Sequence, residues 1–228
     1  MKIIEELPLE LCVFELRYNP MYILWDNMGS IWDSMIAANP ALKLSVVQPN
    51  QQIFETESLQ ITLDISVLRV SGRGPNAIAE VANNANILFK IACDKVKLDS
   101  FTRAGFRFIK SKTFPSPAHA LKFANIAGTE ETAALGKEGK KIGFVTSTRF
   151  ESDSAGLLAG LRVEEREWNF MLPWESRPLF SEKLSGKSWA LVSDVDYYTI
   201  GVIAKESLDV EMWVNQAIKA IQLYWSEV

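Results

Sequence analysis

Apolar and polar positions follow the same order of elements twice along the chain. Strict alternation over residues 12–18, with Phe14 and Tyr18 on one side, predicts a half-buried strand. Apolar residues at helical spacing, further short strands and a long amphipathic helix come next, and the series then restarts. The pattern predicts two similar halves, residues 1–98 and 99–228, that form one compact domain about a pseudo-twofold axis.

Each half is expected to contain several strands and two helices. The first half has strands at 12–18, 42–47 and 51–56, a longer strand that starts at Ile61 and is broken by Gly72 and Gly74, and helices at 28–36 and 78–92. The second half has strands at 101–109, 142–150, 157–170 and 189–202, and helices at 118–126 and 208–226. Two segments, 128–141 and 172–187, are expected to be irregular because glycine, proline and charged residues dominate them.

This order predicts an α+β fold, a tandem duplication of a βαββ(β)α unit with antiparallel sheets and long helices on one face. Two such units in tandem resemble the duplicated saddle of the TATA-binding-protein fold in element order. Because fold does not fix function, the resemblance assigns none.

Composition and charge exclude some functions. The 228 residues include 48% hydrophobic and 23% charged residues, which is typical of a globular chain. A net charge of −4 and the lack of a strongly basic segment disfavour nucleic-acid binding. The acidic N-terminal segment does not fit a signal peptide, and no apolar run is long enough to span a membrane, so we expect a cytoplasmic protein without membrane contact.

Few residues suit metal or nucleophilic chemistry. Cys12 and Cys93 lie among apolar neighbours and are interpreted as buried free thiols. His119 is the one histidine, so a zinc site or a histidine-based triad is not expected. The sequence therefore predicts no metal, no cofactor and no catalytic residue, and it favours a protein that is not an enzyme without deciding the question.

Three segments and the closing helix together resemble a known family. Residues 14–20 read FELRYNP and residues 103–109 read RAGFRFI, which are similar to its opening Glu-Phe-Arg-Phe-like and central Gly-x-Arg-Tyr/Phe-Ile strands. Residues 194–197 read DVDY, which is similar to its late Asp-x-Asp strand. The family is a sporadically distributed set of uncharacterised prokaryotic proteins. The resemblance implies the architecture and supplies no catalytic residue; this chain departs from it at Lys110, where the family usually has asparagine.

Charged residues on the expected strands form the candidate site. They lie opposite the apolar positions and so point to the sheet face that the helices leave open. The candidate ligand-binding residues are Arg17, Arg103, Arg107, Asp194 and Asp196. Two interpretations remain open: a polar groove for an anionic small ligand, nucleotide or peptide, or cross-strand ion pairs that only solvate the sheet. The Asp194-x-Asp196 pair could also hold Mg²⁺, but no third ligand can be placed.

Tryptophans form a second set of candidates, because aromatic side chains can anchor a protein partner as well as fill a core. The interaction candidates are Trp168, Trp174, Trp213 and Trp225. Trp213 and Trp225 lie on the last helix, whose polar residues form one narrow stripe. That pattern predicts burial against the sheet and the other half, or in a homodimer.

These observations leave two main hypotheses of function. The first is a non-enzymatic binding or regulatory module that uses the open sheet face, the segment 168–174, or self-association through the last helix. The second is an enzyme or ligand-binding protein that acts on an anionic small molecule or nucleotide at the open face. A deep pocket with convergent polar groups would favour the second, and an exposed apolar patch the first.

Overall fold

A computed structural model describes residues 4–48, 50–125, 144–170 and 184–227. The first half contains β1 (Leu9–Arg17), α1 (Ile23–Ala38), β2 (Lys43–Gln48), β3 (Gln51–Glu55), β4 (Leu59–Asp64), β5 (Val67–Gly72) and α2 (Ala77–Val96). The second contains β6 (Ser100–Phe101), β7 (Arg103–Phe114), α3 (Pro117–Phe123), β8 (Phe144–Glu151), β9 (Ala155–Phe170), β10 (Leu184–Thr199), β11 (Ile203–Ala204), a 3₁₀ turn (Lys205–Ser207) and α4 (Val210–Glu227).

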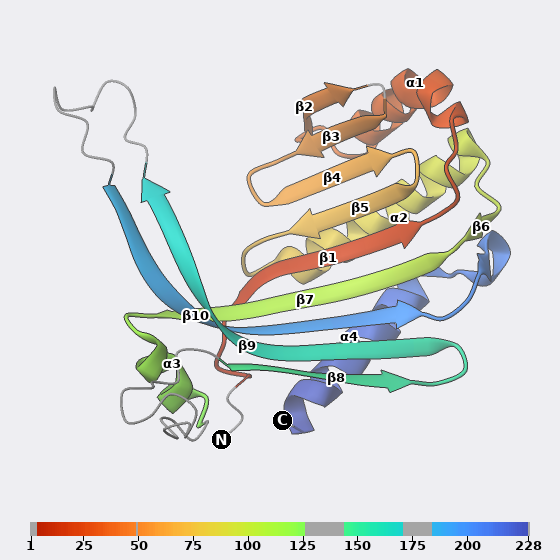
Figure 1. The fold of residues 1–228 in the computed structure, drawn as a ribbon. Helices are drawn as coiled ribbons and strands as arrows, with labels where there is room; N and C mark the ends of the chain where they lie inside the picture. The colour runs from red at the N-terminus through yellow and green to blue at the C-terminus, as the bar shows by residue number, and fades with distance from the viewer. Residues whose placement is uncertain (1–3, 49, 126–143, 171–183, 228) are drawn as a thin grey trace, which may run out of the picture.

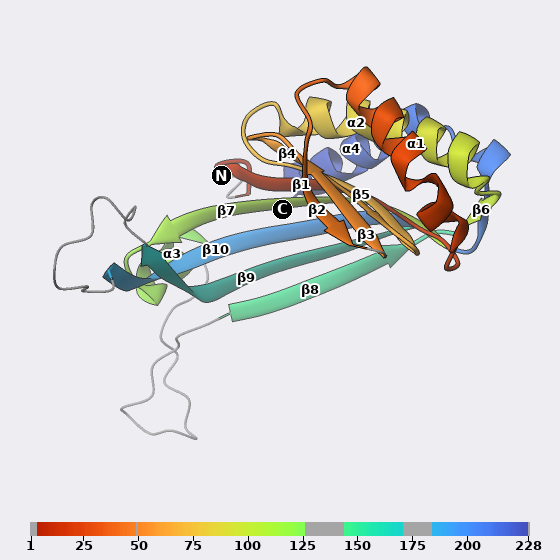
Figure 2. The ribbon, with the colours of Figure 1, turned by 90° about the horizontal axis from the view of Figure 1, so that it is seen from above.

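Nine strands form one antiparallel sheet in the order β2-β3-β4-β5-β1-β7-β10-β9-β8. The two halves meet where β1 pairs with β7, and each half then runs outward in corresponding order. The helices α1, α2 and α4 lie together on one face of this sheet (Figures 1 and 2). The α+β class predicted from the sequence, with an antiparallel sheet and long helices on one face, is confirmed.

The core lies between the sheet and these helices and is shared by both halves. Phe14 and Phe106 face each other across the β1–β7 pair and are buried together with Phe108. From the helices, Val81 of α2 and Ile221 of α4 are also fully buried in the same cluster. The strand period places these apolar side chains on one face and leaves the charged residues of β1 and β7 on the other.

Local signals set several helix bounds, of which Asn39-Pro40 was expected from the sequence. Asn39-Pro40 ends α1, because proline disfavours helical backbone in the residue before it. Lys97 adopts a left-handed conformation (φ 54°) and ends α2. Ser116 caps α3 by accepting a hydrogen bond from the backbone N–H of His119. These local features set where α1 and α2 end and where α3 begins.

One expected strand is in fact two. The prediction of a single long strand from Ile61 to Gly72 is wrong, because a tight turn at residues 65–66 separates β4 from β5. The Asp64 carboxylate accepts hydrogen bonds from the backbone N–H of Ser66 (3.2 Å) and from its hydroxyl (3.3 Å). A side chain therefore builds this turn without glycine or proline.

The expected irregular segment 128–141 lies outside the described residues, and so does most of 172–187, of which residues 184–187 belong to β10. Among the described residues, no helix is both long and apolar enough to cross a membrane.

The contact between the sheet and α2 is close at Gly72. A methyl group added there would lie 2.8 Å from Cγ2 of Val81 and 3.4 Å from the Cβ of Ala77. We expect Gly72→Ala to lower the free energy of unfolding by about 1–3 kcal/mol, because a packed core resists added volume. Urea denaturation followed by circular dichroism measures the change.

Gly29 provides the matched control for this substitution. It is exposed within α1, and a methyl group there would meet no atom within 4 Å. Gly29→Ala should raise the free energy of unfolding by about 0.5–1 kcal/mol, because alanine favours a helix interior. Equal effects of the two substitutions would contradict a tight α2–sheet contact.

Candidate functional site

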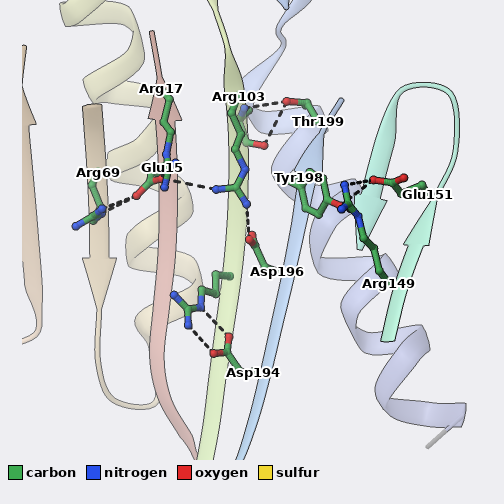
Figure 3. A network of polar contacts seen from close by, with 12 residues as sticks. Glu15, Arg17, Arg69, Arg103, Arg149, Glu151, Asp194, Asp196, Tyr198 and Thr199 are labelled. Carbon is green, nitrogen blue, oxygen red and sulfur yellow. Dashed lines mark hydrogen bonds and ion pairs between the residues drawn. The ribbon is translucent and has the colours of Figure 1, made fainter. Parts of the chain in front are cut away.

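Glu15 is the centre of a charged network on the open sheet face. Arg69 of β5 donates to its Oε2 from Nε (2.9 Å) and Nη2 (2.6 Å), and Arg17 donates to its Oε1 from Nε (2.6 Å). Nη1 of Arg103 on β7 lies 3.8 Å from the same Oε1. The Glu15 side chain is only 11% exposed, so three guanidinium groups surround one largely buried carboxylate (Figure 3).

A second pair of contacts joins β7 to β10. Arg107 binds Asp194 in a bidentate manner, from Nε to Oδ1 (2.7 Å) and from Nη2 to Oδ2 (2.5 Å). The residue directly opposite Arg107 in the strand pair is Asp196, so Arg107 reaches the Asp194 carboxylate diagonally across the two strands. Nη2 of Arg103 forms an ion pair with Asp196, and Nη1 of Arg162 lies 3.3 Å from Asp194.

Burial raises the pKa of the carboxyl groups of Glu15, Asp194 and Asp196, and the nearby arginines lower it. Burial raises the pKa of Glu15, but the hydrogen bonds and charges of Arg69 and Arg17 outweigh it and leave the pKa below its usual value. The pKa of Asp194 is lowered in the same way, with Arg107 as the main opponent of burial. At Asp196 burial outweighs the attraction of Arg103, and the pKa is raised.

The network lines an open groove of about 590 Å³ that crosses the sheet from the β3–β4 connection to β10. No described helix covers this face, because α1, α2 and α4 lie on the other side of the strands (Figures 2 and 3). The charged side chains in its lining are Arg17, Arg69, Arg73, Arg103, Arg107, Glu15, Glu55, Glu57 and Asp196. The arginines next to Glu15 and Asp196 stand at one end, and Glu55 and Glu57 at the other.

The ion pairs leave part of the arginine donors unused. Among the described residues, Arg17 donates only from Nε, although its side chain is 52% exposed, and Nη1 of both Arg69 and Arg107 makes no hydrogen bond. Each guanidinium carries five N–H groups, so the groove presents several unused donors whose positions are fixed by carboxylates.

The structure brings the five sequence-predicted site residues together. Arg17, Arg103, Arg107 and Asp196 line the groove, and Asp194 holds Arg107 from its edge. Cross-strand ion pairs and a polar groove, which the sequence left as alternatives, occur together.

Sequence reasoning missed the contribution of β5 and of the β3–β4 connection. Arg69 was not predicted, because the turn that separates β4 from β5 was not recognised. Glu55, Glu57 and Arg73, at the ends of β3 and β5, were not predicted either. The alternation of Val67, Arg69 and Ser71 with buried residues in β5 is the signal that could have found Arg69.

The tryptophan candidates divide into two groups. Trp174 and the side chain of Trp168 lie outside the described residues. Trp213 and Trp225 are only 8% and 6% exposed, and their rings contact Phe14 and Phe108 of the sheet. These two rings fill the core of a single copy, as one of the two readings of α4 predicted, and present little surface to a partner.

Other reactive side chains lie away from the groove. His119 Nδ1 is 2.7 Å from Ser116 Oγ, but this exposed pair caps the short helix α3. Burial raises the pKa of the Cys12 and Cys93 thiols, that of Cys93 to about 11, so both are protonated at neutral pH. Among the residues that the structure describes, no three carboxylate, histidine or cysteine side chains group as metal ligands.

Comparison with known proteins finds no match for this chain. No protein-family model matches the chain and no curated protein matches it, so the family resemblance drawn from the sequence stays a prediction.

Proposed function

We propose that this chain is a binding protein without catalytic machinery, and that it holds an anionic ligand in the groove on the open sheet face. One observation carries the proposal: four arginines on three adjacent strands are held by three carboxylates, and their unused N–H groups remain in an open groove. The carboxylates would act as positioning residues, and the remaining N–H groups would bind the ligand.

Preorganisation is the physical reason that the ion pairs support binding. A free arginine loses side-chain entropy when it binds an anion, whereas an arginine already held by a carboxylate has lost most of it. Arg107 is held by two hydrogen bonds and Arg69 by two, so their planes are fixed before a ligand arrives. Planar guanidinium groups suit carboxylate and phosphate oxygens, which they bind in a bidentate manner.

The residue types in the groove support binding rather than catalysis. The described residues that line it include no histidine, cysteine, lysine or tyrosine. Its hydroxyl groups include that of Ser58, which hydrogen-bonds to Glu80 (2.8 Å) and not to a group that could activate it as a nucleophile in the groove.

The sign of the charges argues for a small anion rather than a nucleic acid. Five arginines and four carboxylates line the groove. Four of the arginines gather around Glu15 and Asp196, whereas Arg73, whose backbone N–H donates to Ser58 (2.9 Å), lies at the end with Glu55 and Glu57, so positive charge is in excess only near Glu15. Glu55 and Glu57 at the other end would repel a continuing phosphate backbone. They would favour a ligand that carries hydrogen-bond donors or positive charge beyond its acid group.

We also infer that the groove lies on the axis of an internal duplication. The central strands β1 and β7 supply three of the four arginines, and the strand order runs outward from them in corresponding sequence. This order supports the duplication that the sequence predicted.

The test is ligand-induced thermal stabilisation at low ionic strength, with pyrophosphate and citrate as probes and isothermal titration calorimetry on any probe that stabilises. The Arg17→Gln/Arg107→Gln double variant should raise the Kd at least about tenfold, because each charge-assisted hydrogen bond contributes more than 1 kcal/mol. Glu15 keeps Arg69 and Asp194 keeps Arg162 in this variant, so the fold should persist.

Arg166→Gln provides the matched control. Arg166 pairs with Glu10 and Glu164 on the same sheet but does not line the groove. The Kd of the Arg166→Gln variant for the probe should equal that of the wild-type protein. Equal weakening by both variants, or no stabilisation by either probe, would count against the proposed site.

A further inference from the structure

The two edges of the sheet are built differently. The edge strand β2 has an irregular register between Leu44 and Val46 and carries Lys43, and α1 covers its end of the sheet, where Trp32 stacks on Phe54. Bulges, lysines and covering elements prevent an edge strand from pairing with another chain. The opposite edge, β8, pairs with β9 in unbroken register over its whole length.

No corresponding protection is found on β8 among the described residues. Its sequence FVTSTRFE has no proline and no lysine, and the side chains of residues 145–151 are exposed on both faces. Val145 is 77% and Phe150 is 51% exposed. The short helix α3 lies beside β7, β9 and β10. Helix α4 reaches β8 through one ring contact, Tyr224 with Phe150 (centroids 6.2 Å apart), which leaves Phe150 half exposed and the outer backbone edge of β8 uncovered by a described helix.

The number of strands in each half also indicates that β8 is an unprotected edge. The first half contributes five strands to the sheet and the second half four, so β8 ends the second half where β3 stands in the first. The backbone N–H and C=O groups on the outer side of β8 have no strand beside them in the described part of the chain. An exposed, regular strand of this kind is a template for pairing.

We propose that β8 pairs in antiparallel fashion with β8 of a second copy, about a twofold axis perpendicular to the sheet and centred on Ser147. This symmetry keeps the helices of both copies on one side and joins the two sheets into one. It is an isologous contact, since the same strand supplies both surfaces, and so it closes as a dimer.

The side chains of β8 are self-complementary in this register. Phe144 lies opposite Phe150 of the other copy on the helix face, and Thr146 lies opposite Thr148. On the open face Val145 lies opposite Arg149, so the two arginines avoid each other. Aromatic and threonine pairs across strands stabilise a sheet, whereas a register centred on Arg149 would oppose two like charges.

The dimer leaves the groove free. Its lining ends at Asp196 on β10, and β9 separates β10 from β8. A single strand pair buries a small area, so we expect association in the micromolar range. The inference is independent of the proposed ligand.

Disulfide cross-linking tests both the pairing and its register. In Ser147→Cys the two introduced thiols face each other across the axis, at a separation between directly opposed strand residues that a disulfide can span. Mild oxidation should convert the protein to a covalent dimer. The native Cys12 and Cys93 are buried and should not react. Val47→Cys, exposed on the other edge strand, is the control and should stay uncoupled.

Sedimentation velocity over a dilution series provides the second measurement. The wild-type protein should dimerise and Ser147→Lys should remain monomeric, because two ammonium groups would meet at the axis. Val47→Lys should dimerise as the wild type does. A wild-type monomer at hundreds of micromolar, or a dimer that persists unchanged in Ser147→Lys, would overturn the proposal.

Discussion

Trp213→Ala is expected to lower the free energy of unfolding by about 3–5 kcal/mol, as large-to-small changes at buried aromatic residues do. The Trp213 ring is 8% exposed and lies between Phe14 of β1 (ring centroids 6.1 Å apart) and Tyr197 of β10 (5.7 Å). Its removal would leave a cavity where α4 joins the strands of both halves. Chemical denaturation followed by far-ultraviolet circular dichroism measures the loss.

Met212 provides the control on the same helix. It is the neighbour of Trp213 in sequence but is 56% exposed, so Met212→Ala should change the free energy of unfolding by less than about 0.5 kcal/mol. Together the two variants show whether Trp213 stabilises the core of a single copy or serves as an interface residue. A Trp213→Ala protein with unchanged monomer stability and a changed oligomeric state would assign the ring to a partner and contradict its role in the core.

The layers of this fold could be predicted from the sequence, because buried positions recur with the period of a strand or of a helix. Phe14, Leu16, Phe106 and Phe108 alternate with charged or small residues, and that alternation is enough to assign them to the covered face. The polar stripe of α4, including Glu211, is exposed as its spacing predicted. These signals are local, so a single chain carries them.

Pairing between distant segments could not be predicted in the same way. Glu15 and Arg69 are 54 residues apart and Arg103 and Asp196 are 93 apart, so their contacts depend on strand order and register. The turn at 65–66 is built by the Asp64 side chain, and the apolar alternation continues through it. Alternation therefore predicts the right face for Arg17 and Arg107, but it predicts neither their partners nor Arg69.

Glu15→Gln is expected to lower the free energy of unfolding at pH 7 by about 2 kcal/mol. This lies between the small value of exposed ion pairs and the 3–5 kcal/mol lost when a fully buried pair is broken, because Glu15 is buried while Arg17 and Arg69 are about half exposed. The variant leaves three guanidinium groups around a neutral amide. Urea denaturation at pH 7 measures the difference from the wild-type protein.

The same substitution makes a prediction about pH. The folded protein lowers the pKa of Glu15 below its ordinary value of 4.5, so the folded state binds its proton less tightly than the unfolded chain. The stability from this carboxylate is therefore complete above about pH 4.5 and is lost as the pH falls through the lowered pKa. The difference between wild type and Glu15→Gln should be largest at neutral pH and shrink on acidification.

Asp196→Asn should show the opposite trend, because burial raises the pKa of Asp196 above its ordinary 3.8. The folded state binds this proton more tightly than the unfolded chain, so the wild-type protein gains stability relative to Asp196→Asn as the pH falls through the raised pKa. Two carboxylates of one groove would then respond to acid with opposite signs. If both differences shrank together on acidification, Asp196 would be held as firmly by Arg103 as Glu15 is by its arginines, and burial would not dominate at β10.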